Sequence, residues 1–147
     1  MKLIDTDETI VLVTGSSLTA EERDRPLAYR LKSEIDRRGI GHAYRRAVVV
    51  ADLWYLENRI FHLNPTIAIG GPGANGVSND FAESLPMVYS REERVFVQAD
   101  FESDVKRASL WGVDSAQTAL AVEIFMTQGY LDDLLNRIWR FRTGVFV

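Results

Sequence analysis

Residues 9–17 read Thr-Ile-Val-Leu-Val-Thr-Gly-Ser-Ser, a β-branched apolar run that passes directly into a small polar turn. A short, continuous apolar run is typical of a strand that is covered on both faces, as strands of parallel sheets are. Three further runs of this kind follow, at residues 46–51, 65–69 and 106–111. Helical segments separate the runs, and strand–helix–strand units have right-handed parallel crossovers. The sequence therefore predicts an α/β fold, a Rossmann-like three-layer sandwich with a mainly parallel sheet.

Helix signals lie between the predicted strands. A short turn and then a main helix are expected over residues 26–38, with Leu27, Leu31 and Ile35 as its inner stripe and Gly39 as its end. Asp114 has the position of an N-cap for a helix that is apolar nearly all round. This apolar helix is expected over residues 116–126, and the other helical segments expected are residues 53–57 and 78–85.

Two segments, one near the middle and one at the end of the chain, indicate how the sheet ends at one edge and where a protein partner would bind. Residues 86–89 and 94–98 flank a polar turn, a pattern that predicts an antiparallel hairpin at one edge of the sheet. A last helix is expected over residues 131–140, and it has an apolar stripe. The stripe consists of Leu131, Leu134, Leu135, Ile138 and Trp139. It can dock on its own domain or on a second copy, so self-association or a protein partner through this C-terminal helix is one hypothesis.

Composition bounds the class of protein. The 147 residues are expected to form a single α/β domain, residues 1–147, without internal repeats. The net charge is −4, whereas nucleic-acid binders carry a basic surplus, so no nucleic-acid partner is expected. The absence of cysteine excludes disulfides, thiolate metal ligands and a cysteine nucleophile. Residues 1–8 lack an apolar signal segment and no run is long enough for a membrane helix, so a cytoplasmic protein without membrane partner is expected.

Small and polar residues follow each predicted strand. Because the carboxyl ends of parallel strands share one edge, and ligands of open α/β sheets bind just outside it, these residues define a candidate ligand site. Glycines let backbone amides approach a ligand closely, and helix N-termini favour anions, so a small anionic ligand is expected. The candidate ligand-binding residues are Thr14, Gly15, Ser16, Asp52, Gly70, Gly71, Gly73, Asn75, Asn79, Asp80 and Asp114. The open alternative is that glycines and caps occur there because turns need them.

The sequence contains no complete motif for catalysis or for cofactor binding. Residues 14–17 are not followed by the further glycines of a dinucleotide turn, and no Gly-Lys-Ser/Thr of a phosphate loop occurs. Ser78 lacks the closing glycine of a nucleophile elbow, so it is interpreted as a helix N-cap. His42 and His62 have no metal-ligand spacing, so no metal site is expected, and His62 is interpreted as a half-buried packing residue. From the sequence, the cofactor and the catalytic residues are therefore unknown.

Residues 67–75, Ile-Ala-Ile-Gly-Gly-Pro-Gly-Ala-Asn, carry a resemblance to a known family. They resemble the strand-then-GGPxxN element of α/β modules in archaeal S-layer and other cell-surface proteins. Residues 111–119 are similar to the strand, glycine and small-residue helix start that such modules have downstream, and the first strand with residues 14–16 fits as well. The resemblance implies a structural or adhesive module with no known catalytic residues.

Two hypotheses for the function follow. The favoured one is a non-catalytic binding or assembly module that holds a small anionic ligand at the carboxyl edge of the sheet. The alternative is an enzyme that acts on a nucleotide or sugar-phosphate-like small molecule at the same edge, through Asp52, Asn75, Asp80 or Asp114.

Overall fold

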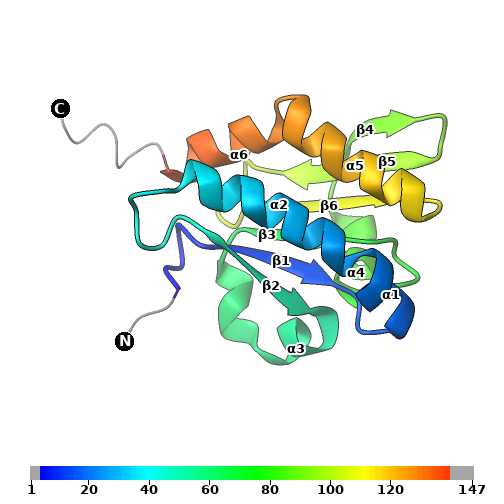
Figure 1. The fold of residues 1–147 in the computed structure, drawn as a ribbon, viewed down its shortest axis with the longest axis horizontal. Coiled ribbons are helices and arrows are strands. Elements are labelled where there is room, and N and C mark those ends of the chain that lie inside the picture. The colour runs from blue at the N-terminus through cyan, green and yellow to red at the C-terminus, as the bar shows by residue number, and fades with distance from the viewer. Residues whose placement is uncertain (1–3, 140–147) are drawn as a thin grey trace.

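The computed structural model describes residues 4–139. It consists of a six-stranded mixed sheet with helices on both faces (Figure 1). The strand order is β2-β1-β3-β6-β5-β4. The strands are β1 (Ile10–Thr14), β2 (Ala47–Ala51), β3 (Thr66–Ile69), β4 (Met87–Arg91), β5 (Val95–Asp100) and β6 (Arg107–Gly112). The first four in this order are parallel, and β5 and β4 continue the sheet as an antiparallel hairpin. The predicted Rossmann-like architecture and its edge hairpin are confirmed.

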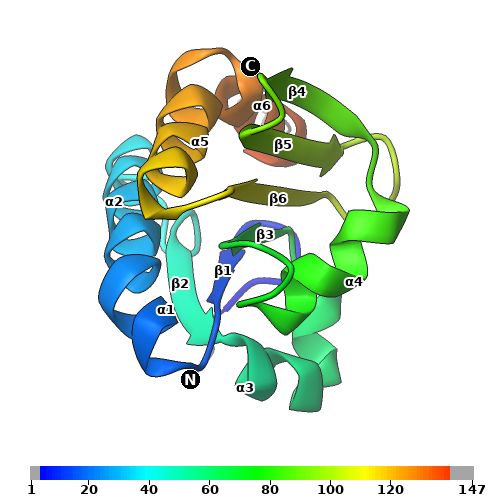
Figure 2. The ribbon, with the colours of Figure 1, turned by 90° about the vertical axis from the view of Figure 1, so that its right-hand side faces the viewer.

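The helices divide between the two faces of the sheet (Figure 2). They are α1 (Leu18–Arg23), α2 (Arg25–Arg38), α3 (Asp52–Glu57), the 3₁₀ helix η1 (Arg59–Leu63), α4 (Gly76–Ser84), α5 (Ser115–Thr127) and α6 (Tyr130–Trp139). The larger core lies under α2, α5 and α6, and the smaller one under α3 and α4. Side chains of a strand alternate between faces, so Ile10 and Leu12 enter the larger core whereas Val11 and Val13 enter the smaller one.

The connection from β1 to β2 differs from the prediction at its start. The expected short turn is the helix α1, whose N-cap is Ser17. Pro26 occupies the first turn of α2, where its missing N–H costs no hydrogen bond. Gly39 ends α2 as predicted, although its φ of −94° is open to any residue. Glycine is required there by a close approach, since a Cβ on Gly39 would lie 1.7 Å from the Arg45 carbonyl oxygen.

Strand β2 is an edge strand and is less buried than the sequence predicts, although both of its faces are covered, since Val49 packs against the larger core and Val48 and Val50 against the smaller one. It pairs with β1 alone, and all its residues except Ala47 are half-buried. Helix α2 covers the start of this edge. Asp36 Oδ1 accepts a hydrogen bond from the Ala47 N–H at 2.9 Å, and Lys32 Nζ donates to the Ala47 carbonyl at 2.6 Å. These bonds occupy backbone groups that an open edge would offer to another strand.

Helix α6 packs its apolar stripe against the core of its own domain. Leu131, Leu134, Leu135 and Trp139 are buried, and Ile138 is half-buried against the same core. The stripe is therefore not left for a second copy of the chain, and the hypothesis of assembly through this helix loses its basis. The expected last residue of the helix, Arg140, lies outside the described residues. Among the described residues, no helix has the length and apolar character needed to cross a membrane.

The turn between β4 and β5 holds two non-glycine residues in the left-handed region, Glu92 with φ 52° and Glu93 with φ 54°. A tight turn with two such residues at its centre prefers Asn-Gly, because a side chain in the left-handed region is strained by about 1–2 kcal/mol. Replacing the pair by Asn-Gly should therefore raise the free energy of unfolding by about 1–2 kcal/mol, measured by urea denaturation. The control is Glu92→Gln with Glu93→Gln, which removes the charges and keeps the strain. An equal gain in the control would contradict the backbone explanation.

Candidate functional site

Strand β3 lies between two crevices at the carboxyl edge of the sheet. The helices that follow β1 and β6 pack on one face, whereas α4, which follows β3, packs on the other (Figure 2). Where consecutive helices leave a sheet in opposite directions, a crevice opens between the two strands, and ligands bind there. The crevice between β1 and β3 and the crevice between β3 and β6 are therefore both candidates.

Asn75 fills the first crevice, between β1 and β3. Its Nδ2 donates to the carbonyls of Val13 at 2.9 Å and Ile69 at 3.1 Å, and its Oδ1 accepts from the N–H groups of Val77 at 2.9 Å and Ser78 at 3.2 Å. A side-chain amide has two donor hydrogens and two acceptor lone pairs, so these bonds use all of its capacity. Asn75 therefore caps α4 and ties β1 to β3, and it has no hydrogen bond left for a ligand.

Gly15 closes the same crevice by contact. A Cβ on Gly15 would lie 2.0 Å from the Ala74 carbonyl oxygen, so the loops after β1 and β3 touch through their backbones. The predicted site residues Gly15 and Asn75 are both brought to the carboxyl edge, as expected. Their role there is architectural, which corresponds to the alternative that the sequence left open.

Asp52 also connects loops at the carboxyl edge, and it follows β2, the neighbour of β1 at the edge of the sheet. Its Oδ2 accepts from the Gly76 N–H at 2.7 Å, and its Oδ1 accepts from the Leu53 N–H at 2.8 Å and from the Ser16 hydroxyl. The carboxylate is buried and joins the loops after β1, β2 and β3. Ser16 and Asp52 are thus committed to each other and to the backbone.

The remaining predicted residues near α4 lie away from any open crevice. Ser78 is not the N-cap that the sequence predicts, because Asn75 holds that position. Ser78 is buried and donates its hydroxyl to the Gly70 carbonyl at 2.6 Å. Asn79 and Asp80 are exposed on α4. His62 is half-buried and stacks on Tyr55 with ring centroids 4.2 Å apart, which confirms its interpretation as a packing residue.

The crevice between β3 and β6 is open and forms a cleft of about 490 Å³. Segments from α1, the β3–α4 loop and the start of α5 line it. The lining residues are Thr19, Ala20, Arg23, Asp24, Gly71, Pro72, Gly73, Ala74, Trp111, Gly112, Val113, Asp114, Ser115 and Thr118. Of the predicted site residues, Gly71, Gly73 and Asp114 line this cleft.

Asp24 is the residue of the cleft that sequence reasoning missed. It sits between α1 and α2, where an aspartate is ordinarily an N-cap, yet its side chain makes no capping hydrogen bond. Only 8% of the residue is exposed, and within residues 4–139 its carboxylate has no hydrogen bond and no ion pair. Burial raises the pKa of the Asp24 carboxyl group above its usual value, and the positive charge of Arg23 partly opposes this rise.

Gly70 makes room for the Asp24 carboxylate. Its φ is +115°, a conformation open to glycine, and a Cβ at this position would lie 2.6 Å from Asp24 Oδ2. The carboxylate therefore lies directly against the backbone at the carboxyl end of β3. Of the three glycines in the GGPxxN element, Gly70 is the one with positive φ, so the loop requires a glycine there on conformational grounds.

The opposite wall of the cleft carries a second charged group and an aromatic ring. Arg23 Nη1 donates to the Ser115 hydroxyl at 3.3 Å, at the start of α5. Trp111 stacks on Phe96 with ring centroids 4.2 Å apart. Asp114 caps α5 as predicted and lies 3.8 Å from the Arg94 guanidinium. The charged lining residues are thus one arginine and two aspartates, which gives an anion no surplus of positive charge.

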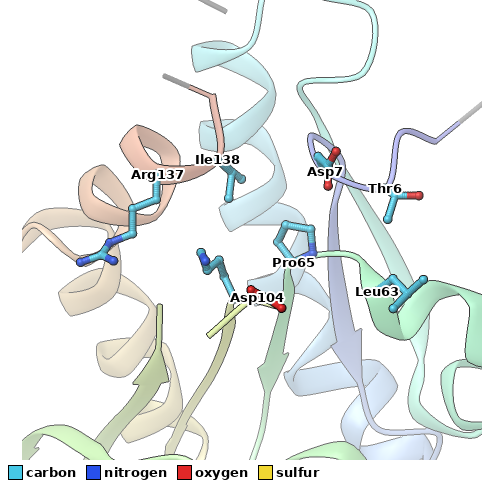
Figure 3. A pocket seen from close by; sticks show the side chains of 8 residues that line it. Thr6, Asp7, Leu63, Pro65, Asp104, Arg137 and Ile138 are labelled. Carbon is cyan, nitrogen blue, oxygen red and sulfur yellow. The ribbon is translucent and has the colours of Figure 1, made fainter. Parts of the chain in front are cut away.

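A smaller pocket of about 240 Å³ lies at the opposite, amino edge of the sheet (Figure 3). Its cationic side chains are already engaged, since Lys106 Nζ donates to the Ser103 carbonyl at 2.5 Å and Arg137 pairs with Asp133 at 2.8 Å. Figure 3 shows the Arg137 guanidinium turned away from Asp7 and Asp104. The pocket therefore offers mainly groups that the fold uses, and the carboxyl-edge cleft is the stronger candidate.

No protein-family model matches this chain, and no curated protein is similar to it at a significant level.

The unpartnered carboxylate leads to a stability prediction. Asp24→Asn removes a buried, unpaired charge, so it should raise the free energy of unfolding by about 1 kcal/mol at neutral pH. Because the folded state raises the pKa of this carboxyl group, the wild type loses stability as the pH rises from about 4 through the folded-state pKa. The advantage of the variant should therefore vanish as the pH falls toward about 4.

Urea unfolding of both proteins across this pH range measures the difference. Asp80→Asn, which removes an exposed charge on α4, serves as the control. A variant less stable than the wild type at neutral pH would mean that the Asp24 carboxylate has a stabilising partner in solution.

Proposed function

We propose that this chain is a non-catalytic binding module that holds a small polar molecule in the cleft between the β3–α4 loop and the start of α5. The observation that carries the proposal is the Asp24 carboxylate, which lines the cleft, is buried and has no partner among the described residues. A buried charge without a partner costs free energy, and a bound ligand with a hydrogen-bond donor would offset this cost. The cleft volume of about 490 Å³ lies within the range of small-molecule sites.

The hydroxyl groups of the cleft support binding rather than nucleophilic chemistry. Ser115 accepts a hydrogen bond from Arg23, and Thr118 Oγ1 accepts one from the Gly112 N–H at 3.0 Å. A nucleophilic hydroxyl would in addition donate its proton to an adjacent base, and among residues 4–139 no hydrogen bond joins the Ser115 or Thr118 hydroxyl to such a base. Neither His42 nor His62 belongs to the lining.

A thermal-melt screen tests the proposal. The panel covers sugars, nucleotides, sugar phosphates, carboxylic acids, amines and amino acids. A ligand at about 100 times its dissociation constant stabilises the fold by about 2.7 kcal/mol, so a hit should raise the melting temperature by several degrees.

Gly73→Phe should remove the shift, because no atom lies within 4 Å of a Cβ at Gly73 and the new ring can enter the cleft without local strain. Asn79→Phe places the same ring on the exposed part of α4 and should keep the shift. Hits that survive Gly73→Phe would locate binding elsewhere.

Catalysis in the same cleft on a nucleotide or sugar-phosphate-like molecule is an alternative function. The burial of Asp24 in the cleft favours it, because a desolvated carboxyl group with a raised pKa is suited to proton transfer. Hits from the screen should then be converted during incubation with the protein, and Asp24→Asn should stop the conversion. Recovery of every hit unchanged would count against catalysis.

Assembly with a second copy of the chain is favoured by a different surface from the one first predicted. Exposed apolar side chains gather on α3 and η1, a group called here the α3–η1 cluster. Its members are Leu53, Trp54, Leu56, Ile60 and Leu63. The exposed Glu57 and Arg59 lie between them, and in a two-fold contact Glu57 of one copy can meet Arg59 of the other.

Sedimentation velocity over a range of concentrations tests this assembly. We expect a dimer that the substitution Ile60→Glu dissociates. Ile60 is 73% exposed, so its replacement should leave the fold intact. A strict monomer at high concentration would refute assembly.

A further inference from the structure

Arg23 and Asp24 are consecutive residues with opposite charges, and both line the cleft. They are directed to different strands. Arg23 reaches Ser115 at the start of α5, which follows β6, whereas the Asp24 carboxylate lies against Gly70 at the end of β3. Within the described part of the chain, no ion pair joins the two side chains. The cleft therefore holds a positive and a negative group that face a ligand from two sides.

Each of the two groups has a defined complement. A desolvated carboxylate without a partner favours a cationic donor, and charge-assisted hydrogen bonds of this kind are among the strongest. The Arg23 guanidinium keeps further donors beyond its bond to Ser115, and it lies beside the first turn of the 13-residue helix α5. Guanidinium donors and a helix N-terminus both favour a carboxylate. Trp111 also lines the cleft, and an aromatic residue is compatible with a bound ammonium group.

The charges of the lining disfavour simpler ligands. A lone amine would meet the repulsion of Arg23, and a lone anion would meet that of Asp24 and Asp114. A molecule that carries both charges meets attraction at both positions. We propose that the ligand of this cleft is a small zwitterion, which places a protonated amine on Asp24 and a carboxylate on Arg23 and the first turn of α5. This inference rests on the proposed function and specifies its ligand class.

The experiment is a thermal-melt and calorimetric comparison of matched compounds with the whole chain. The probes are the common amino acids, β-alanine and 4-aminobutyrate at about 10 mM, each set beside its deaminated and decarboxylated analogue. At least one zwitterion should raise the melting temperature by several degrees. Removal of either its amine or its carboxylate should weaken binding by about tenfold or more, the loss of one charged contact.

Variants connect the result to the two side chains. Asp24→Asn and Arg23→Gln should each weaken binding of the zwitterion by about tenfold or more. Arg25→Gln is the matched control for Arg23→Gln. Arg25 is two residues after Arg23, pairs with Glu21 and does not line the cleft. The substitution should leave the affinity unchanged. Since Asp24→Asn is expected to stabilise the unliganded fold, unfolding does not explain its loss of binding.

The inference fails if no zwitterion shifts the melting temperature, or if a zwitterion binds Asp24→Asn as tightly as the wild type. Should another compound of the screen bind and lose its effect in Gly73→Phe, the proposed function stands and only the ligand class is wrong. Should no compound bind at all, both proposals fail.

Discussion

Replacing Asn75 by alanine should lower the free energy of unfolding by about 3–5 kcal/mol, the largest effect that we expect at the carboxyl edge. The substitution removes four hydrogen bonds at once, two to strand carbonyls and two from the first turn of α4. Only 1% of Asn75 is exposed, so water does not replace these partners without opening the fold. Urea unfolding followed by circular dichroism measures the change.

Two further variants make the Asn75 result specific. Asn79→Ala, one turn later on α4 with an exposed side chain, should change stability by no more than about 0.5 kcal/mol. Asn75→Asp keeps the acceptor for the N–H groups of α4 but directs a carboxylate at the Val13 and Ile69 carbonyls, so it should also destabilise strongly. If Asn75→Ala were tolerated, the side chain would be free to serve a ligand, as the sequence alone had predicted.

Gly15→Ala should destabilise the fold by about 3 kcal/mol or more, the second large effect. The added methyl group would lie 2.0 Å from the Ala74 carbonyl oxygen and 3.0 Å from the Ala20 Cβ. Backbone on one side and helix α1 on the other leave no flexible side chain to move away, so the loops after β1 and β3 must separate. Thermal and urea unfolding of the purified variant measure the loss.

Gly73→Ala is the control for Gly15→Ala, because a Cβ at Gly73 meets no atom within 4 Å. Its effect should stay below about 0.5 kcal/mol, with a small gain from the reduced freedom of the unfolded chain. A Gly15→Ala protein as stable as the wild type would mean that the β1–β3 crevice opens in solution and competes with the cleft as a site.

The contacts of Asn75 and Gly70 explain why the GGPxxN element at residues 70–75 has these residue types. Its asparagine caps α4 and joins two strands, and its first glycine makes room for Asp24 with a positive φ. These are architectural tasks within the fold. The relationship to S-layer and cell-surface modules stays a prediction, as does the cytoplasmic location.

Much of the fold could be predicted because it depends on local patterns. The apolar runs at β1, β3 and β6 identified the strands, and Asp114 identified the start of α5. The edge position of β2 was not predictable in this way, because strand order depends on how distant segments pack. The exposed helix η1 also lacked a recognisable signal.

The sequence by itself determined that the small and polar residues after the strands gather at one edge, since parallel strands share the direction of their carboxyl ends. Only the tertiary structure decided which of them remain available. Contacts between loops that are far apart in the chain already occupy Asn75, Asp52 and Gly15. Asp24, an ordinary helix cap by its position, is instead buried in the cleft and has no partner among residues 4–139. Hydrogen-bond capacity is used up by neighbours in space, and a linear sequence does not show those neighbours.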